Sequence, residues 1–579
     1  MREIVTIQVG GISNYIGSHF WNFQSYSLKD ELLGLAEENN GDPVYKNTDM
    51  DMDVFYRAGE THQGIPTYTP RLLSIDMQGA LGSLRASGSL YEGVPSLDAS
   101  SVVTWKGKST KHVSEPHKKN LFLQSLEDED ESLSYCNELA GGIEDNQTQE
   151  DKDKQCVDCL ENGVEFWTDY SKVHFHPQSL FELNGLWRGP HEFNNYGTGR
   201  EVFSECLQGE EISTRLRFFV EECDHMQGFQ FIVDDSGGFS SVAAEFLEQI
   251  SDEYRNIPIL LYAARGPDSY TNIPSWKASM SKNLHDAISF SRLSSFCNLM
   301  VPLGLPSLSQ SDASRFLCVD DAKPFHTSAV YAAALHSISL PFRMMLPGPS
   351  ANSELIAGAL DIGTMTQMLS GQAWQNMVTI LDMAMPSPLI GERNEVGLHR
   401  SLRSLTPNIA EGSEDRRGVE TMVIHGALLS GGSRASIHQV KNSIEYGYQN
   451  QAIRPLFSHL STSLCPLPIP LPFPSIFGNR IGGYGEILEE PIFGVRARGS
   501  LGVSSIPMAT RLRSSKAILP FIEKRLADIR KLGTARGSYG VELLQSWGFQ
   551  KDEVDDMAEG LAKMAHALKD QPEISSDSD

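Results

Sequence analysis

The sequence predicts an α/β protein whose first domain is a parallel β-sheet with helices on its faces. Two observations lead to this fold class: short apolar strands recur in the first half of the chain, and glycine turns followed by helical patterns come directly after two of them. Strand, turn, helix and strand in this order are typical of a parallel sheet, whose ligands bind at the carboxyl ends of the strands. Any ligand site of this domain is therefore expected at the glycine turns.

Four apolar stretches are predicted to be strands of this sheet. The chain opens with EIVTIQV, a nearly continuous apolar run, as is usual for a buried parallel strand. The other three stretches are RLLSID at 71–76, FQFIVD at 229–234 and IPILLYAA at 257–264. Apolar residues recur at helical spacing in 242–254, which predicts a helix between the third and fourth strands.

An acidic stretch at about 104–165 interrupts the first domain, which we expect to span 1–344. The stretch contains LEDEDESLSYCNELAGGIEDNQTQEDKDKQ, where hydrophobic residues are few and acidic residues are dense. Such a composition offers little apolar surface to bury, so a disordered or loosely held insertion is expected. Aromatic and aliphatic residues return in WTDYSKVHFHPQSLFEL at 167–183.

A second α/β domain is predicted from 345 to 510, followed by C-terminal helices and an acidic tail from 511 to 579. The clearest strand of the second domain is TMVIHGAL at 421–428, and SIHQVKNSIEYGY after it reads as a helix. In FIEKRLADIRKLG at 521–533, apolar residues stand at i, i+4 and i+7, which predicts a helix that packs one face on the body.

Charge and composition exclude several classes of protein. The 579 residues include 74 acidic and 48 basic side chains, and the formal net charge of -26 opposes binding to nucleic acid, so no nucleic-acid partner is expected. No uninterrupted apolar run reaches about 18 residues, so no integral membrane segment is predicted. The first residues lack the layout of a signal or transit peptide, and the eight scattered cysteines do not form a disulfide pattern. We expect a cytoplasmic protein with reduced thiols.

Two glycine turns are candidate phosphate sites. VGGISNYIG at 9–17 and DDSGGFSSV at 234–242 both follow a strand and precede a helix, where backbone N–H groups and the helix dipole favour an anion. The alternative for the first is a plain tight turn. In the second, Asp234 and Asp235 bring negative charge to the mouth of the turn, although an exposed carboxylate there could instead cap the helix. Phe239 would also have to be kept away from a phosphate.

Other chemistry is not supported by the motifs. Cys156 and Cys159, followed by His174 and His176, are of ligand types that zinc accepts, but they read better as loop thiols and a histidine pair, so no metal site is predicted. The chain has no Gly-x-Ser-x-Gly nucleophile motif, no zinc-protease helix and no Walker-type loop. We therefore predict no catalytic residues.

Several segments resemble the tubulin family. The tubulin nucleotide loop, Gly-Gln-Cys-Gly-Asn-Gln-Ile-Gly, is matched at Gly10, Asn14, Ile16 and Gly17. The segment at 68–85 resembles the tubulin stretch that carries Asp-Leu-Glu-Pro-Gly, with an aspartate kept at 76. FNNYGTGREVF at 193–203 resembles the Gly-Asn-Asn-Trp loop, and MQGFQ at 226–230 is shared almost intact. The segment at 167–183 looks typical of the divergent Misato branch, so the chain resembles the Misato family more closely than tubulin proper.

The chain departs from tubulins where phosphates are bound and hydrolysed. Tubulins have Gly-Gly-Gly-Thr-Gly-Ser-Gly where this chain has SGGFSSV at 236–242, and the lost glycines restrict backbone approach to a phosphate. The tubulin Gly-x-x-Asn-x-Asp segment is expected shortly after 328–343 and is not found there. Hydrolysis by the family mechanism, and the head-to-tail polymerisation that depends on it, are therefore not expected.

The resemblance implies a tubulin/FtsZ-like fold and a non-catalytic function. Misato relatives imply support of mitochondrial distribution, morphology and inheritance, through contacts with tubulin, the cytosolic chaperonin or mitochondrial-surface factors. The resemblance also implies a cytoplasmic location and, as a second location, peripheral attachment at the mitochondrial outer surface. The alternatives are a GTP-binding GTPase or polymer subunit, with GTP or GDP as ligand, and a chaperonin-assisted assembly factor for tubulin. The candidate nucleotide-binding residues are Gly10, Gly11, Asn14, Asp76, Asn194, Asn195, Gly237, Gly238 and Ser240.

Overall fold

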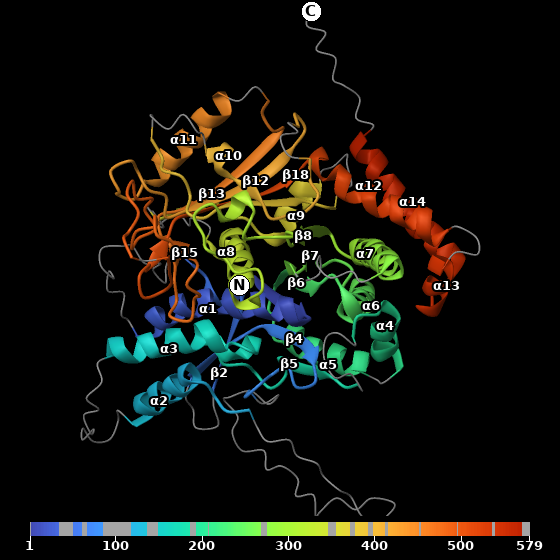
Figure 1. Cartoon of the computed structure of the whole chain (residues 1–579), viewed down its shortest axis with the longest axis horizontal. Coiled ribbons are helices and arrows are strands. Elements are labelled where there is room, and N and C mark those ends of the chain that lie inside the picture. Colours follow the sequence, from blue (N-terminus) through green and yellow to red (C-terminus); the bar gives the residue numbers. More distant parts are fainter. Residues whose placement is uncertain are drawn as a thin grey trace, which may run out of the picture.

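A central helix lies between two sheets in the computed structural model of the chain (Figure 1). The structure describes residues 2–33, 50–60, 66–84, 117–135, 149–185, 193–205, 208–267, 275–345, 355–370, 377–391, 398–410, 415–450, 453–494, 496–534 and 539–569. The central helix is α8 (Pro324–Arg343), and all of its residues from Phe325 onward are buried. The acidic end at 572–579, expected to be a tail, lies outside the described residues.

The first sheet has six strands, all parallel. Its order is β5-β4-β1-β6-β7-β8. The strands are β1 (Glu3–Val9), β4 (Leu72–Met77), β5 (Leu180–Leu183), β6 (Met226–Asp234), β7 (Ile259–Ala264) and β8 (Leu299–Leu303). The four strands predicted from apolar runs are thus confirmed. Since the strands are parallel, the chain segments that follow β1, β4 and β6 meet at one edge of the sheet.

Helices cover both faces of the first sheet (Figure 1). On one face lie α1 (Gly11–Leu33) and α8; on the other lie α4 (Tyr196–Glu205), α5 (Gln208–Glu221), α6 (Gly237–Glu253) and α7 (Trp276–Ser295). Alternate residues of β1 explain the two cores, because Val5, Ile7 and Val9 pack with α6 while Gln8 points to α1. The Gln8 amide fills the space at Gly17, where a Cβ would lie 2.1 Å from its Nε2 atom.

The second sheet is mixed and also has six strands. Its order is β11-β10-β18-β12-β13-β9, in which only the β12–β13 pair is parallel. The strands are β9 (Ile356–Ala357), β10 (Ile380–Ala384), β11 (Arg403–Ser404), β12 (Val419–His425), β13 (Phe457–Ser463) and β18 (Met508–Ser514). The predicted strand at 421–428 is β12, and the predicted helix after it is α11 (Ile437–Gln449). Strand β18 crosses the expected boundary at 510; the domain limits otherwise stay a prediction.

Smaller elements complete the body. Three two-stranded pairs join β2 (Tyr56–Glu60) to β3 (Pro66–Pro70), β14 (Leu467–Pro468) to β17 (Ser505–Ile506), and β15 (Phe477–Gly478) to β16 (Ala497–Arg498). Further α-helices are α9 (Ile362–Ser370) and α10 (Leu398–Ser401). Short 3-10 turns lie at Met52–Val54, Trp167–Tyr170, Asp312–Ser314 and Lys516–Ile518.

The predicted C-terminal helices pack against α7 at the side of the molecule (Figure 1). They are α12 (Leu519–Asp528), a π turn (Ile529–Gly533), α13 (Tyr539–Ser546) and α14 (Lys551–Lys569). As the spacing predicts, Ile522 and Ile529 are buried, and they share a core with Leu284 of α7 and Leu561 of α14.

The described parts of the acidic insertion form two helices, so these parts differ from the disordered or loosely held insertion expected at 104–165. These are α2 (Leu121–Tyr135) and α3 (Gln149–Gly163), which lie together away from α12 and α14 (Figure 1). Phe122, Cys156 and Leu160 are buried in a small core with Tyr170 and Phe325. A few apolar residues at helical spacing therefore anchor a stretch whose average composition is acidic; 104–116 and 136–148 lie outside the described residues.

Candidate functional site

The carboxyl edge of the first sheet brings the candidate residues into two neighbouring groups. Gly10, Gly11 and Asn14 begin α1 beside Asp76 of β4, and Gly237, Gly238 and Ser240 begin α6. Asn194 and Asn195 lie near the second group, since a Cβ at Gly237 would be 3.6 Å from the Asn194 Cα. Asp234, the last residue of β6, and Asp235 after it lie between the two groups.

Gly10 is required by the backbone of the first turn, whereas Gly11 is not. Gly10 has a φ of 106°, and a Cβ there would lie 2.5 Å from Cγ of Asp234. Its N–H donates to the Ile75 carbonyl at 3.0 Å, and its own carbonyl accepts the Asn14 N–H at 3.0 Å. A Cβ at Gly11 would meet nothing within 4 Å.

The Asp234 carboxylate occupies the N-terminal turn of α1. Its Oδ2 accepts the Ile12 N–H at 3.1 Å, and its Oδ1 accepts the Ser13 N–H at 2.7 Å and the Ser13 hydroxyl at 2.6 Å. Burial raises the pKa of Asp234 to about 7, even though these hydrogen bonds oppose the shift. A carboxylate therefore caps a helix here, as considered from the sequence, but the helix is α1 and the carboxylate is buried.

Asn14 and Asp76 form a buried hydrogen-bonded pair. The Asn14 amide donates to Oδ2 of Asp76 at 2.9 Å and accepts the Ser74 hydroxyl at 2.8 Å. Oδ2 of Asp76 also accepts the Trp167 indole N–H at 3.1 Å, and its Oδ1 accepts the Met77 N–H at 2.8 Å. Burial raises the pKa of Asp76 to about 6. The polar atoms of both side chains are thus engaged inside the protein.

The α6 turn is closed by aromatic residues. The Gly238 N–H donates to the Phe193 carbonyl at 2.8 Å, and a Cβ at Gly238 would lie 2.6 Å from the Phe193 ring. Phe193 and Phe239 meet edge to face, with ring centroids 5.0 Å apart. Phe239 therefore turns into the core rather than toward the open edge. Gly237 keeps a positive φ of 68°, with the Phe193 carbonyl 2.8 Å from the site of a Cβ.

Ser240 and Asp235 are likewise held by neighbouring side chains. The Ser240 hydroxyl donates to the Gly237 carbonyl at 2.9 Å and lies 3.2 Å from Nε2 of His285. Burial lowers the pKa of His285. Oδ1 of Asp235 pairs with the buried guanidinium of Arg265 at 2.7 Å. Of the two aspartates expected at the mouth of this turn, Asp235 is therefore paired with an arginine.

The two asparagines just before α4 lie at the surface. Both Asn194 and Asn195 are exposed, and the Asn195 side-chain oxygen accepts the Gly197 N–H at 2.8 Å at the start of α4. Asn195 thus caps a helix, which is a common use of asparagine at this position.

Residues after the insertion lie along the first turns of α1. The Tyr15 hydroxyl donates to the Glu165 carbonyl at 2.7 Å, and the Tyr170 hydroxyl donates to the Tyr15 carbonyl at 2.8 Å. The Ser18 hydroxyl donates to the Trp167 carbonyl at 2.7 Å. The segment singled out at 167–183 therefore covers the helix that begins at the first glycine turn.

Glu161 of α3 ties the insertion to the start of α8. Its carboxylate lies 2.6 Å from Nε2 of His326 and 3.2 Å from Nζ of Lys323, and it accepts the Ser475 N–H at 3.1 Å. Burial would raise the pKa of Glu161, but the interactions with His326, Ser475 and Lys323 outweigh it and lower the pKa to about 2. One side chain thus joins the insertion to both domains.

Five residues important to this edge were not identified from the sequence as site residues. They are Ser13, Trp167, Phe193, Arg265 and His285. Ser13 lies inside the first glycine turn, and Trp167 and Phe193 begin the segments at 167–183 and 193–203, so the signal for these three is their place in a motif. Nothing local marked Arg265 and His285.

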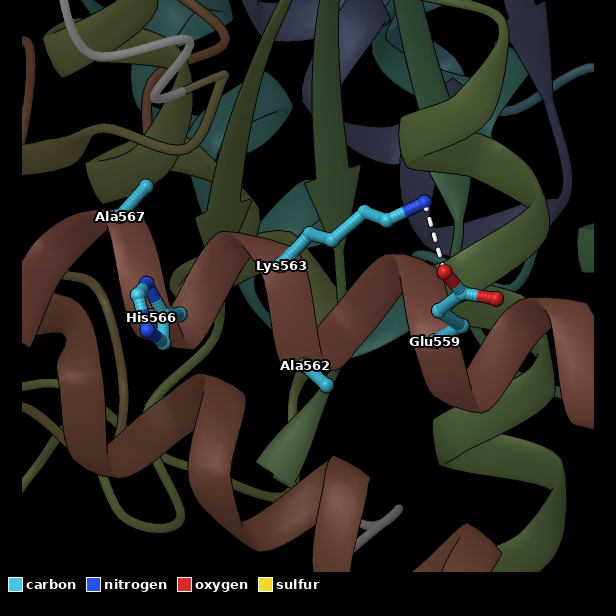
Figure 2. Close-up of a pocket in the computed structure, with 5 residues that line it drawn as sticks. All are labelled: Glu559, Ala562, Lys563, His566 and Ala567. Carbon is cyan, nitrogen blue, oxygen red and sulfur yellow. Dashed lines mark ion pairs between the residues drawn. The ribbon is translucent and has the colours of Figure 1, made fainter.

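The remaining features lie apart from this edge. A shallow hollow on the outer face of α14 is lined by one helix, where Glu559 and Lys563 form an ion pair at 2.9 Å above Ala562 (Figure 2). Among the described residues, no three His, Cys, Asp or Glu side chains gather to hold a metal ion; Cys156 is buried beside Leu160, and His176 stacks on Phe218. No helix in the described ranges is long and apolar enough to cross a membrane.

Comparison with known proteins agrees with this fold. The Misato Segment II tubulin-like domain model matches residues 2–128, and the Tubulin domain model matches 158–344. "Protein misato homolog 1" of Mus musculus is 26% identical over 589 residues, covering 99% of both chains, and that of Homo sapiens is 27% identical over 595 residues, covering 98% of both. The chain belongs to the Misato family.

The two matched regions together include the residues of the edge. "Protein DML1" of Gibberella zeae is 31% identical over 375 residues, 62% of this chain and 64% of that protein. The Misato Segment II region contains Asn14 and Asp76, and the Tubulin domain region contains Trp167, Asp234 and the whole of α8. The expected tubulin-like α/β fold is confirmed.

Proposed function

We propose that this Misato-family chain is a non-catalytic tubulin-fold protein that acts in the cytoplasm through contacts with other proteins. Its role is to support mitochondrial distribution, morphology and inheritance, as the resemblance to the family implies, and a fraction of it attaches peripherally at the mitochondrial outer surface. Its partners are tubulin, the cytosolic chaperonin or factors of the mitochondrial surface.

The closure of the α6 turn is the observation that carries the non-catalytic part of this proposal. A phosphate-binding turn offers the first N–H groups of its helix to the ligand. Here the Gly238 N–H donates to the Phe193 carbonyl, and the rings of Phe193 and Phe239 fill the space beside it. Phosphate groups of GTP or GDP do not fit this turn unless the segment at Phe193 moves away.

Calorimetry with the purified full chain tests this part. We expect no binding of GTP or GDP, with or without magnesium, to a folded sample. Tight binding of either nucleotide would overturn the proposal and favour a GTPase or a polymer subunit. The glycines and asparagines kept at the loops would then be nucleotide-binding residues. Sedimentation in the presence of GTP separates these two, because only a polymer subunit pellets.

Removal of the protein from cells tests the proposed role. We expect altered mitochondrial shape and distribution, restored by the wild-type chain. Unchanged mitochondria and tubulin levels would contradict the role. Recovery of tubulin or chaperonin with the tagged chain would favour the assembly-factor function, whereas recovery of mitochondrial-surface proteins alone would point away from it.

A further inference from the structure

We infer that Asp234 is a built-in ligand of α1: its carboxyl group takes the place at the helix N-terminus that a bound phosphate takes in ligand-dependent folds. The inference rests on the proposed function, in which no nucleotide phosphate competes for this turn. It assigns to the first glycine turn a ligand that is part of the same chain.

The donors around Asp234 form a complete anion cradle. Two backbone N–H groups, of Ile12 and Ser13, and the Ser13 hydroxyl converge on its two oxygens at 2.6 to 3.1 Å. Ser13 is fully buried and Asp234 is 8% exposed, so water contributes little to the cradle. Helix α1 is 23 residues long, and its unpaired N–H groups and dipole favour a negative charge here.

The glycine at position 10 fits this internal ligand. With a φ of 106°, Gly10 passes so close to Asp234 that any Cβ would overlap the carboxyl group at 2.5 Å. The absence of a side chain, which in a phosphate site would admit an external ligand, here admits the aspartate from β6. Gly10, directly after β1, and Asp234, the last residue of the neighbouring strand β6, thus form a matched pair.

This contact links parts of the chain that are distant in sequence. Asp234 and Ser13 are 221 positions apart, and their hydrogen bonds join the end of β6 to the beginning of α1. The nearby basic group, Arg265, is engaged with Asp235 and Asp286 at 2.7 and 2.8 Å. The α1 turn is therefore the partner of the Asp234 carboxylate, and it is held in shape without an external ligand.

Chemical rescue of Asp234→Ala in the full chain tests the inference. The variant should unfold at a lower temperature than the wild type, because three donors lose their acceptor. Sodium formate, which fits the space of the lost carboxylate, should raise the unfolding temperature of the variant saturably; inorganic phosphate is the second probe. Sodium chloride at equal ionic strength should not, and the wild type should not respond to formate.

A second variant keeps the test decisive. Ser13→Ala combined with Asp234→Ala removes one donor of the cradle and should weaken the apparent affinity for formate at least several-fold. If Asp234→Ala does not fold, the isosteric Asp234→Asn is examined by amide hydrogen exchange, and faster exchange at residues 12 and 13 is expected. Wild-type stability of Asp234→Ala, no rescue by formate, or unchanged exchange in Asp234→Asn would each overturn the inference.

The outcomes separate this inference from the proposed function. Nucleotide binding by the wild type, together with formate rescue of Asp234→Ala, would refute the proposed function alone. No nucleotide binding by the wild type, together with no rescue of the variant, would refute the internal ligand alone.

Discussion

Two glycines that are adjacent in the sequence meet different surroundings in the first turn. Gly10 has a positive φ and touches Asp234, whereas the side-chain position of Gly11 is open. Gly10→Ala should therefore lower the free energy of unfolding by about 1–3 kcal/mol or more, from backbone strain and overlap. Gly11→Ala, the matched control, should stay within about 0.5 kcal/mol of the wild type or exceed it. Urea unfolding of both variants measures this; equal losses would contradict the distinction.

The ionisation of Asp234 should make stability depend on pH in a defined direction. Burial raises its pKa in the folded chain to about 7, above the value of about 3.9 for an unfolded aspartate. Between these values the folded state binds more protons, so the free energy of unfolding falls as pH rises and levels off above pH about 7. Asp234→Asn has no titrating group at this position and should lack this pH dependence of the free energy of unfolding.

Urea unfolding of the wild type and of Asp234→Asn, at pH values about one unit apart from about pH 5 to about pH 8, measures the effect. The stability of the wild type relative to the variant should decline as pH rises toward about 7. Asp76, whose pKa is also raised by burial, is present in both proteins, so most of its contribution cancels. A relative stability that rises with pH would show that the hydrogen bonds to Asp234 outweigh its burial.

Individual partners at the edge could be predicted only where a local motif contained them. Asn14 and Asp76 were both chosen from the sequence, and they do form a pair. Their third partner, Trp167, is 91 positions from Asp76, and no spacing rule connects the two. Asp234 was considered as a cap of the helix that follows it, because sequence proximity suggests that helix, while the fold brings it to α1 instead.

At the scale of elements, strands were easier to predict than the helices of the insertion. Strands β1, β6 and β7 are buried on both faces because helices cover the sheet on both sides, and this produces largely apolar runs that are visible without structure. Helix α3 buries only Cys156 and Leu160, so its acidic composition hides the anchoring residues. The average composition of the insertion therefore predicts disorder, although two buried residues four positions apart anchor this helix.

The packing of α3 against the start of α8 should depend on Glu161. Glu161→Gln removes the charge that pairs with His326 and Lys323, and the helix should detach more often from the start of α8. We expect trypsin to cleave at Lys152 or Lys154 several-fold faster than in the wild type. Glu150→Gln removes the same charge from an exposed position of the same helix and is the matched control. Equal cleavage of the two variants would contradict a role of the Glu161 contacts.

At the scale of the whole molecule, α8 makes the two sheets parts of one core. Val330 and Leu335 of this helix share a hydrophobic cluster with Leu260 and Val301 of the first sheet and with Leu512 of the second. The two domains predicted from sequence composition therefore do not have separate interiors. A change in amino-acid composition along the chain can suggest a domain boundary, but it does not say which surfaces pack together.

This shared core predicts that both sheets unfold in one transition, although chains with two domains often unfold in steps. Hydrogen exchange in increasing urea, followed in β6 and β12, should give the same midpoint for both strands. Leu512→Ala removes a fully buried side chain from the shared cluster and should cost about 2–5 kcal/mol, lowering both midpoints together. Val440→Ala in α11 removes buried methyl groups from a separate cluster on the outer side of the second sheet, and it should also lower both midpoints together if the sheets unfold as one unit. Two separate midpoints in the wild type, or a Leu512→Ala effect limited to β12, would show that α8 does not couple the sheets.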